Sequence, residues 1–283
     1  MKKFISGVMT LTLVLALAGC GTEQQPSSEA SQPVSGVEES STTESSSVEE
    51  SSSAEESSAE ESSSEEAAAA VMSYAEYAAA DIDTEVVVET YVQAKQSWWE
   101  DKATVYTQDK DGAYFLYNMA CSEEDYAKLV PGTKIKVKGF KSEWSGEVEI
   151  IDATFEIEEG SYIAPVFDVT ELLGTDELIN HQNEFVAFKG MTVAAAGKDD
   201  SGNDVAYLYK WDGSGQDGDD LYFNVTLGEN TYTFTVESYL CDKDSEVYNA
   251  VKALNIGDKI DMEGFLYWYE GVNPHITSVT PAQ

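Results

Sequence analysis

The chain repeats part of its own sequence, and this repetition constrains its fold more than any other feature. The segment PGTKIKVKGF at 131–140 aligns with IGDKIDMEGF at 256–265, an offset of 125 residues. The same offset holds for three more pairs: Trp144 and Tyr269, Gly146 and Gly271, and Ile151 and Ile276. Upstream, 85–88 aligns with 184–187 at an offset of only 99, so the second copy contains an insertion, which we place at 195–220. Two domains of one fold are therefore expected.

Each copy has the pattern of the same elements. Alternating apolar and polar residues, with Gly and Asn at the turns, predict strands and helices in the order β-β-β-α-β-β. The expected strands of the first copy are 85–94, 104–108, 113–118 and two around Ile135 and Ile150, with helices at 74–80 and 122–129. In the second copy we expect a strand at 184–194, a turn at 227–230, and helices at 170–179 and 243–254.

This order is that of a five-stranded OB-type barrel, whose closure removes exposed strand edges. We therefore expect a mainly β protein with two tandem OB-type β-barrels at 67–160 and 161–283. The 42% hydrophobic content is enough for two cores.

The N-terminus has the features of a secretory signal. Lys2 and Lys3 precede an apolar run at 4–18 that is too short for an ordinary membrane-spanning helix. The segment LAGC at 17–20 resembles the lipobox of bacterial lipoproteins, which implies cleavage after 1–19 and lipidation of Cys20. The expected location is the outer face of the plasma membrane. The alternative is a plain signal peptide with an incidental Cys.

The segment that follows is expected to be a disordered tether. Residues 21–66 hold 17 Ser and 13 Glu and no aromatic residue, so they cannot bury enough apolar surface to form a core. With Cys20, this gives a tether at 20–66. Beyond it, 40 acidic residues and 14 Lys leave a net charge of −26, and the chain has no Arg.

Both copies are similar to OB-fold domains of surface proteins and secreted nucleases of Gram-positive bacteria. The resemblance rests on MSYAE at 72–76, TEVVVE at 84–89 and PGTKIKVKG at 131–139. It implies a noncatalytic binding module, and the fold alone does not name the ligand. No nucleophile elbow, P-loop or zincin motif is present, so no enzyme activity, catalytic residue or cofactor is expected.

Aromatic residues mark the expected ligand site. OB barrels bind ligands across the face of strands 2 and 3, between the loops that join strands 1 to 2 and 4 to 5. The candidates in the first copy are Trp98, Trp99, Tyr106, Tyr114 and Trp144, and those in the second are Tyr209, Trp211, Tyr267, Trp268 and Tyr269. About half of them are expected to fill the cores instead.

The charge of the chain distinguishes among the possible ligands. The only basic stripe consists of Lys134, Lys136, Lys138 and Lys141, which Glu147 and Glu149 on the next strand would neutralise. A net charge of −26 repels polyanions. The leading hypothesis is therefore carbohydrate binding, and nucleic acid is the less favoured partner. Two alternatives stay open: single-stranded nucleic acid bound by the first domain through the Lys stripe, with steep salt dependence, and a scaffold that docks a surface protein.

The remaining candidates are acidic residues for a metal and cysteines for a disulfide. Asp212, Asp217 and Asp219 in the insertion suit calcium, although Asp is also common in turns, so no metal site is expected. Cys121 and Cys241 occupy equivalent positions and are expected to fill their own barrels, with a disulfide between them as the alternative. Nothing in the sequence indicates an oligomer.

Overall fold

The computed structural model describes residues 70–282. They belong to the compact unit Ser64–Gln283, and only this unit is described. The predicted signal peptide, the lipidation site Cys20 and the predicted tether up to residue 66 lie outside the described residues. Within 70–282, no helix has the length and apolar character needed to cross a membrane.

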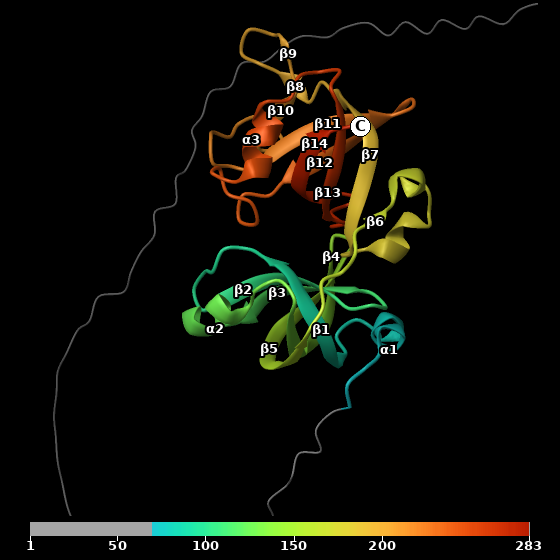
Figure 1. The fold of residues 1–283 in the computed structure, drawn as a ribbon, viewed down its shortest axis with the longest axis vertical. Coiled ribbons are helices and arrows are strands. Elements are labelled where there is room, and N and C mark those ends of the chain that lie inside the picture. The colour runs from blue at the N-terminus through green and yellow to red at the C-terminus, as the bar shows by residue number, and fades with distance from the viewer. Residues whose placement is uncertain (1–69, 283) are drawn as a thin grey trace, which may run out of the picture. The chain divides into compact units, whose positions relative to one another are not determined.

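The first barrel is built from β1 to β5 (Figure 1). Its strands are β1 (Glu85–Lys95), β2 (Lys102–Gln108), β3 (Ala113–Ala120), β4 (Thr133–Trp144) and β5 (Glu147–Ser161), and its helices are α1 (Tyr74–Ala79) and α2 (Glu123–Lys128). The strands close in the order β1-β2-β3-β5-β4. All neighbouring strands are antiparallel except β3 and β5, which pair in parallel.

The second barrel repeats this topology. Its strands are β7 (Phe185–Ala194), β11 (Leu221–Leu227), β12 (Asn230–Val236), β13 (Lys259–Phe265) and β14 (His275–Pro281), with α3 (Glu246–Lys252) after β12. The pairing of β11 with β7 closes the sheet. The additional short elements are β6 (Phe167–Asp168), β8 (Gly197–Lys198), β9 (Asp204–Val205), β10 (Tyr207–Tyr209), and the 3-10 helices η1 (Thr170–Leu172) and η2 (Leu178–His181).

The prediction of two tandem five-stranded OB-type barrels is confirmed. Local signals set the helix starts, because Ser73, Ser122 and Ser245 each accept a hydrogen bond from a backbone N–H of the first turn. The single helix expected at 170–179 is wrong. Two 3-10 helices replace it because Gly174, with φ +80°, breaks the backbone between them.

One glycine of the repeated motif allows a close strand contact in both barrels. Gly139 lies where β4 passes close to β5, and Gly264 lies where β13 passes close to β14. The register shifts at both places. A Cβ atom at Gly264 would lie 2.2 Å from the backbone oxygen of His275 and 2.7 Å from the Cα atom of Ile276. At Gly139 it would lie 2.8 Å from the backbone oxygen of Ile151. The glycines therefore allow the strands to cross at close range.

The two barrels share a buried seam, which we define as the side chains of Tyr106, Phe115 and Phe265 and the residues packed on them. The rings of Tyr106 and Phe265 stack with centroids 4.3 Å apart. The Tyr106 hydroxyl lies 2.7 Å from Nδ1 of His275. The Phe185 N–H donates to Oε1 of Gln108 at 2.8 Å. Apolar contact and directed hydrogen bonds thus act across the same seam.

A buried carboxyl group lies at the edge of this seam. Glu147 opens β5 and is fully buried. Its Oε2 accepts hydrogen bonds from the Trp268 backbone N–H at 2.8 Å and from Nε2 of Gln182 at 3.2 Å, whereas its Oε1 has no partner. Burial raises the pKa of Glu147 to about 8. The carboxyl group is therefore largely protonated at neutral pH.

We predict that Gly264→Ala lowers the free energy of unfolding by about 3 kcal/mol, because its Cβ would collide with backbone that cannot move aside. Urea denaturation measures the change. Gly228→Ala is the control: it has a left-handed backbone (φ +62°) but no atom within 4 Å of the added Cβ, and it should cost only about 1 kcal/mol. Equal losses would show that the close strand crossing is not the reason for the glycine.

We also predict that stability falls as the pH rises from about 5 to about 9, in part because of Glu147. Its pKa is raised in the folded state, so the stabilising proton is fully present below the ordinary value of 4.5 and is lost as the pH passes about 8. Glu147→Gln cannot titrate, and its decline over this range should be smaller by at least about 2 kcal/mol. The measurement is urea denaturation of both proteins at each pH. Parallel stability profiles would contradict the raised pKa of Glu147.

Candidate functional site

The β2–β3 face of the first barrel supplies half of the candidate site. Side chains alternate along a strand, so Val105 of β2 and Leu116 of β3 point into the core, whereas Tyr106 and Phe115 point outward. Thr104 and Tyr117 share that outer face by the same alternation. The second barrel covers Tyr106 and Phe115. Tyr117 stays exposed beside them, whereas Thr104 is only 5% exposed.

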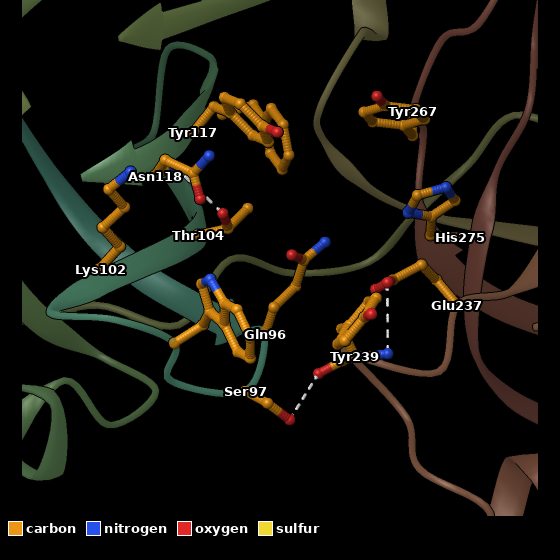
Figure 2. A pocket seen from close by; sticks show the side chains of 12 residues that line it. Gln96, Ser97, Lys102, Thr104, Tyr117, Asn118, Glu237, Tyr239, Tyr267 and His275 are labelled. Atoms are coloured by element: carbon orange, nitrogen blue, oxygen red, sulfur yellow. Dashed lines mark hydrogen bonds between the residues drawn. The ribbon is translucent and has the colours of Figure 1, made fainter. Parts of the chain in front are cut away.

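The uncovered part of this face forms a cavity of about 440 Å³, which we call cleft 1 (Figure 2). Both barrels and the loop between β1 and β2 line it. The lining residues are Gln96, Ser97, Trp99, Lys102, Thr104, Phe115, Tyr117, Asn118, Glu237, Tyr239, Tyr267 and His275. Cleft 1 thus combines the expected OB ligand face with a second wall from the other barrel.

Three aromatic rings in cleft 1 are exposed. Trp99 is 66% exposed, Tyr239 65% and Tyr117 45%. A tight turn holds Trp99, because its backbone exchanges two hydrogen bonds with Lys102. Tyr239 is held by its carbonyl oxygen, which accepts from the Ser97 N–H at 2.7 Å and from Oγ of Ser97 at 3.2 Å. The backbones are fixed while the ring faces remain open to a ligand.

Polar groups complete cleft 1. Glu237 is 9% exposed, and burial together with the nearby charge of Asp220 raises its pKa to about 7. Burial lowers the pKa of His275 to about 3, so its ring is neutral. The Tyr106 hydroxyl and Nδ1 of His275 form a hydrogen bond of 2.7 Å, which fixes the orientation of the imidazole ring. Lys102 is the one lysine among the residues that line cleft 1.

The second barrel carries an equivalent cavity of about 360 Å³ on its own β11–β12 face, which we call cleft 2. Trp211 from the insertion is 76% exposed beside it, and Tyr269 lies in the loop between β13 and β14. The remaining lining residues are Ala196, Leu208, Tyr222, Asn224, Thr233, Val272 and Asn273. Trp144 of the first barrel packs on Tyr269 with ring centroids 5.1 Å apart.

The predicted ligand residues fall into two groups. Five lie in or beside the clefts: Trp99 and Tyr267 in cleft 1, Trp211 and Tyr269 in cleft 2, and Trp144 against Tyr269. The other five have structural contacts, namely Trp98, Tyr106, Tyr114, Tyr209 and Trp268.

The predictions for Tyr106 and Tyr114 as ligand residues are wrong. Tyr106 faces outward but lies fully buried in the seam, and Tyr114 points into the first core at 1% exposure. Trp98 donates its Nε1–H to the Cys121 carbonyl oxygen at 2.9 Å. Tyr209 and Trp268 pack against the core of the second barrel. These five aromatic residues stabilise the fold.

The Lys stripe is not a free basic surface. Lys134 pairs with Glu89 at 2.6 Å and Glu158 at 2.8 Å, and Lys138 pairs with Glu85 at 3.3 Å. Lys136 lies between Glu89 and Glu156 in the strand register. Neutralisation is thus present, but the expectation that Glu147 and Glu149 supply it is wrong, because these two lie opposite Trp144 and Ser142.

Lys141 departs from the stripe altogether. It is 6% exposed, and its Nζ donates to the carbonyl oxygens of Tyr77, Ala78 and Ala80 at 3.0, 3.0 and 2.8 Å. These carbonyls lie at the end of α1, where helical partners are missing and a cation is favourable. Lys141 therefore caps α1 and cannot contact a phosphate.

The candidate calcium ligands have other partners. Asp212 accepts from the Ser214 N–H, Asp217 pairs with Lys252, and Asp219 accepts from the Gln216 N–H. Among residues 70–282, no group of three or more His, Cys, Asp or Glu residues is arranged to hold a metal ion. Cys121 is buried in the first barrel, Cys241 packs against the second core, and both thiols are free.

Sequence reasoning missed Tyr117, Tyr239 and Glu237. Tyr117 follows Phe115 by two residues, so the alternation of β3 already placed it on the outer face. Tyr239 and Glu237 lie beyond β12, on the other barrel. No local pattern connects them with the β2–β3 face, because the seam alone brings them there.

Comparison with known proteins gives no family and only a distant structural likeness. Neither a family model nor a curated protein matches the chain. A murine DNA-binding protein bound to double-stranded DNA has a TM-score of 0.32 and 10% identity, over 70% of this chain and 96% of that one. The HINa domain of Ifi202 in complex with 20-bp double-stranded DNA has a TM-score of 0.30 and 13% identity, over 71% of this chain and 100% of that one. A replication protein A heterotrimer bound to single-stranded DNA has a TM-score of 0.29 and 10% identity, over 70% of this chain and 49% of that one.

These neighbours correct two predictions. All three are named for complexes with DNA, whereas the sequence favoured carbohydrate and ranked nucleic acid lower as a partner. The prediction of carbohydrate binding is therefore wrong, and so is the prediction that nucleic acid is the less favoured partner. The OB-type assignment rests on the strand order and closure described above.

Proposed function

We propose that this chain is a noncatalytic binding protein that holds a short segment of single-stranded nucleic acid in cleft 1. The observation that carries the proposal is the group of three exposed rings, Trp99, Tyr117 and Tyr239, around one cavity on the β2–β3 face. Bases stack on such rings for about 1–3 kcal/mol each, whatever their sequence. Bases in a duplex are already stacked and paired, so an unpaired strand is the suitable ligand.

Charge limits how such a ligand is held. The net charge of −26 over 67–283 repels phosphates, and the lysines of the Lys stripe are paired, flanked by carboxylates or buried. Lys102 in cleft 1 takes part in none of the salt bridges between residues 70 and 282. One phosphate contact, at Lys102, is compatible with this negative net charge. Stacking must supply most of the affinity.

The proposed location is the outer face of the plasma membrane of a bacterium, with Cys20 as the lipid-bearing residue. Support comes from the charged start, the apolar run and the LAGC segment of the sequence. A long Ser- and Glu-rich segment between Cys20 and the barrels would hold the clefts away from the lipid surface.

We predict that the chain binds a mixed-sequence single strand of about 12 nucleotides at least tenfold more tightly than the matching duplex, as measured by fluorescence anisotropy. Trp99→Ala and Tyr117→Ala should each weaken binding about tenfold, because each removes one stacking face. Raising the salt from about 50 to about 200 mM should change the affinity less than about threefold, since few counterions are released.

Two control variants accompany this experiment. Trp98→Phe alters a tryptophan that bonds the Cys121 carbonyl, outside the lining of cleft 1, and Lys136→Ala removes one member of the Lys stripe. Both should bind like the unaltered chain. Absence of binding to any single strand, or a steep loss with salt together with a loss in Lys136→Ala, would contradict the proposed site.

The location has its own test. Cys20→Ser should move the protein from the membrane fraction to the medium, because a signal peptide without the lipid-bearing Cys leaves no stable anchor. Immunoblotting of both fractions is the measurement. Retention of the Cys20→Ser protein in the membrane fraction would contradict lipid anchoring and leave the proposed ligand unaffected.

A further inference from the structure

Glu237 is the carboxylate among the residues that line cleft 1, and one of its two carboxyl oxygens has no hydrogen-bond partner. It follows β12 directly and is 9% exposed. Oε1 accepts from the Tyr239 backbone N–H at 3.2 Å, which orients the carboxyl group. Oε2 has no hydrogen-bond partner. A buried acceptor without a donor is unfavourable, so a ligand that supplies the donor would be bound more tightly.

The surroundings of Glu237 allow a ligand to reach it. Figure 2 shows its carboxyl group beside the Tyr239 ring, with His275 and Tyr267 on the same side of cleft 1. The Tyr239 ring is 65% exposed, and among the described residues its hydroxyl group makes no hydrogen bond. A ligand that displaces this ring from beside the carboxyl group would approach Oε2 without breaking the backbone bond to Oε1.

The donor must come from the edge of a base whose face stacks on the rings. Cytosine, adenine and guanine each carry an exocyclic amino group, which a carboxylate accepts from readily. Thymine has no amino group, and its single ring N–H lies between two carbonyl oxygens that a carboxylate repels. The chemistry of Oε2 therefore separates bases that stack equally well.

We propose that Glu237 is a specificity-determining residue of cleft 1, whose Oε2 accepts a hydrogen bond from the exocyclic amino group of a stacked base and thereby disfavours thymine and uracil. This inference rests on the proposed function. It adds selection by base to a site whose aromatic faces do not select.

Binding of the full chain to oligo-dC and oligo-dT of about 12 nucleotides tests the inference, because the two pyrimidines have similar faces and differ at the edge. The unaltered chain should bind oligo-dC at least about tenfold more tightly than oligo-dT at pH 8. In Glu237→Gln this ratio should fall below about threefold, because the Gln amide can rotate to offer either a donor or an acceptor.

Glu229→Gln is the matched control. It removes one negative charge from the exposed turn between β11 and β12 of the same barrel, and it should keep the preference of the unaltered chain. Because the readout is a ratio between two ligands, a uniform gain or loss of affinity from the charge change cancels.

The outcomes separate the two proposals. If no single strand binds, the proposed function fails. If oligo-dC and oligo-dT bind equally to the unaltered chain, the function stands and the role of Glu237 is overturned, a result that needs no variant to fold. A tenfold preference that persists in Glu237→Gln also overturns it.

Discussion

The buried contact of Tyr106 with Phe265 and His275 is the interaction on which the rest of the site depends. Tyr106 projects from the outer face of β2, where an OB barrel standing alone would expose it. The stack on Phe265 and the hydrogen bond to His275 instead remove it from solvent and attach the second barrel to this face. The ring at this position thus joins the barrels, and only the neighbouring part of the face is left for a ligand.

This seam also gives cleft 1 its chemistry. Glu237 and His275 come from the second barrel and carry pKa values shifted by burial in opposite directions, with the carboxyl raised to about 7 and the imidazole lowered to about 3. Both shifts reflect the cost of holding a charge in this buried place. Cleft 1 is therefore an aromatic cavity that is unfavourable for unpaired charge, which favours stacking over phosphate contact as the basis of binding.

Local patterns predicted the fold well, and they also placed some of the aromatic residues that line the two clefts. The repeat, the alternation of strand residues and the Ser caps identified two five-stranded barrels, and the loops identified Trp99, Trp211 and Tyr269 near the clefts. The same reasoning failed for Tyr106 and Tyr114 and for the helix at 170–179. An aromatic residue in a barrel can face the core, a neighbouring domain or solvent. The residue type alone does not distinguish these three environments.

The sequence by itself determined the two barrels and the negative net charge. The barrels follow from periodicity and turn chemistry, which act over a few residues, and the charge follows from the composition of the whole chain. Tertiary structure alone decided which aromatic rings stay open, which carboxylates pair with Lys134 and Lys138, and that Lys141 caps α1. It also brought Glu237 and Tyr239 to the face of β2 and β3, more than a hundred residues away in the chain. Such contacts are set by strand register and by packing between barrels, which no local pattern encodes.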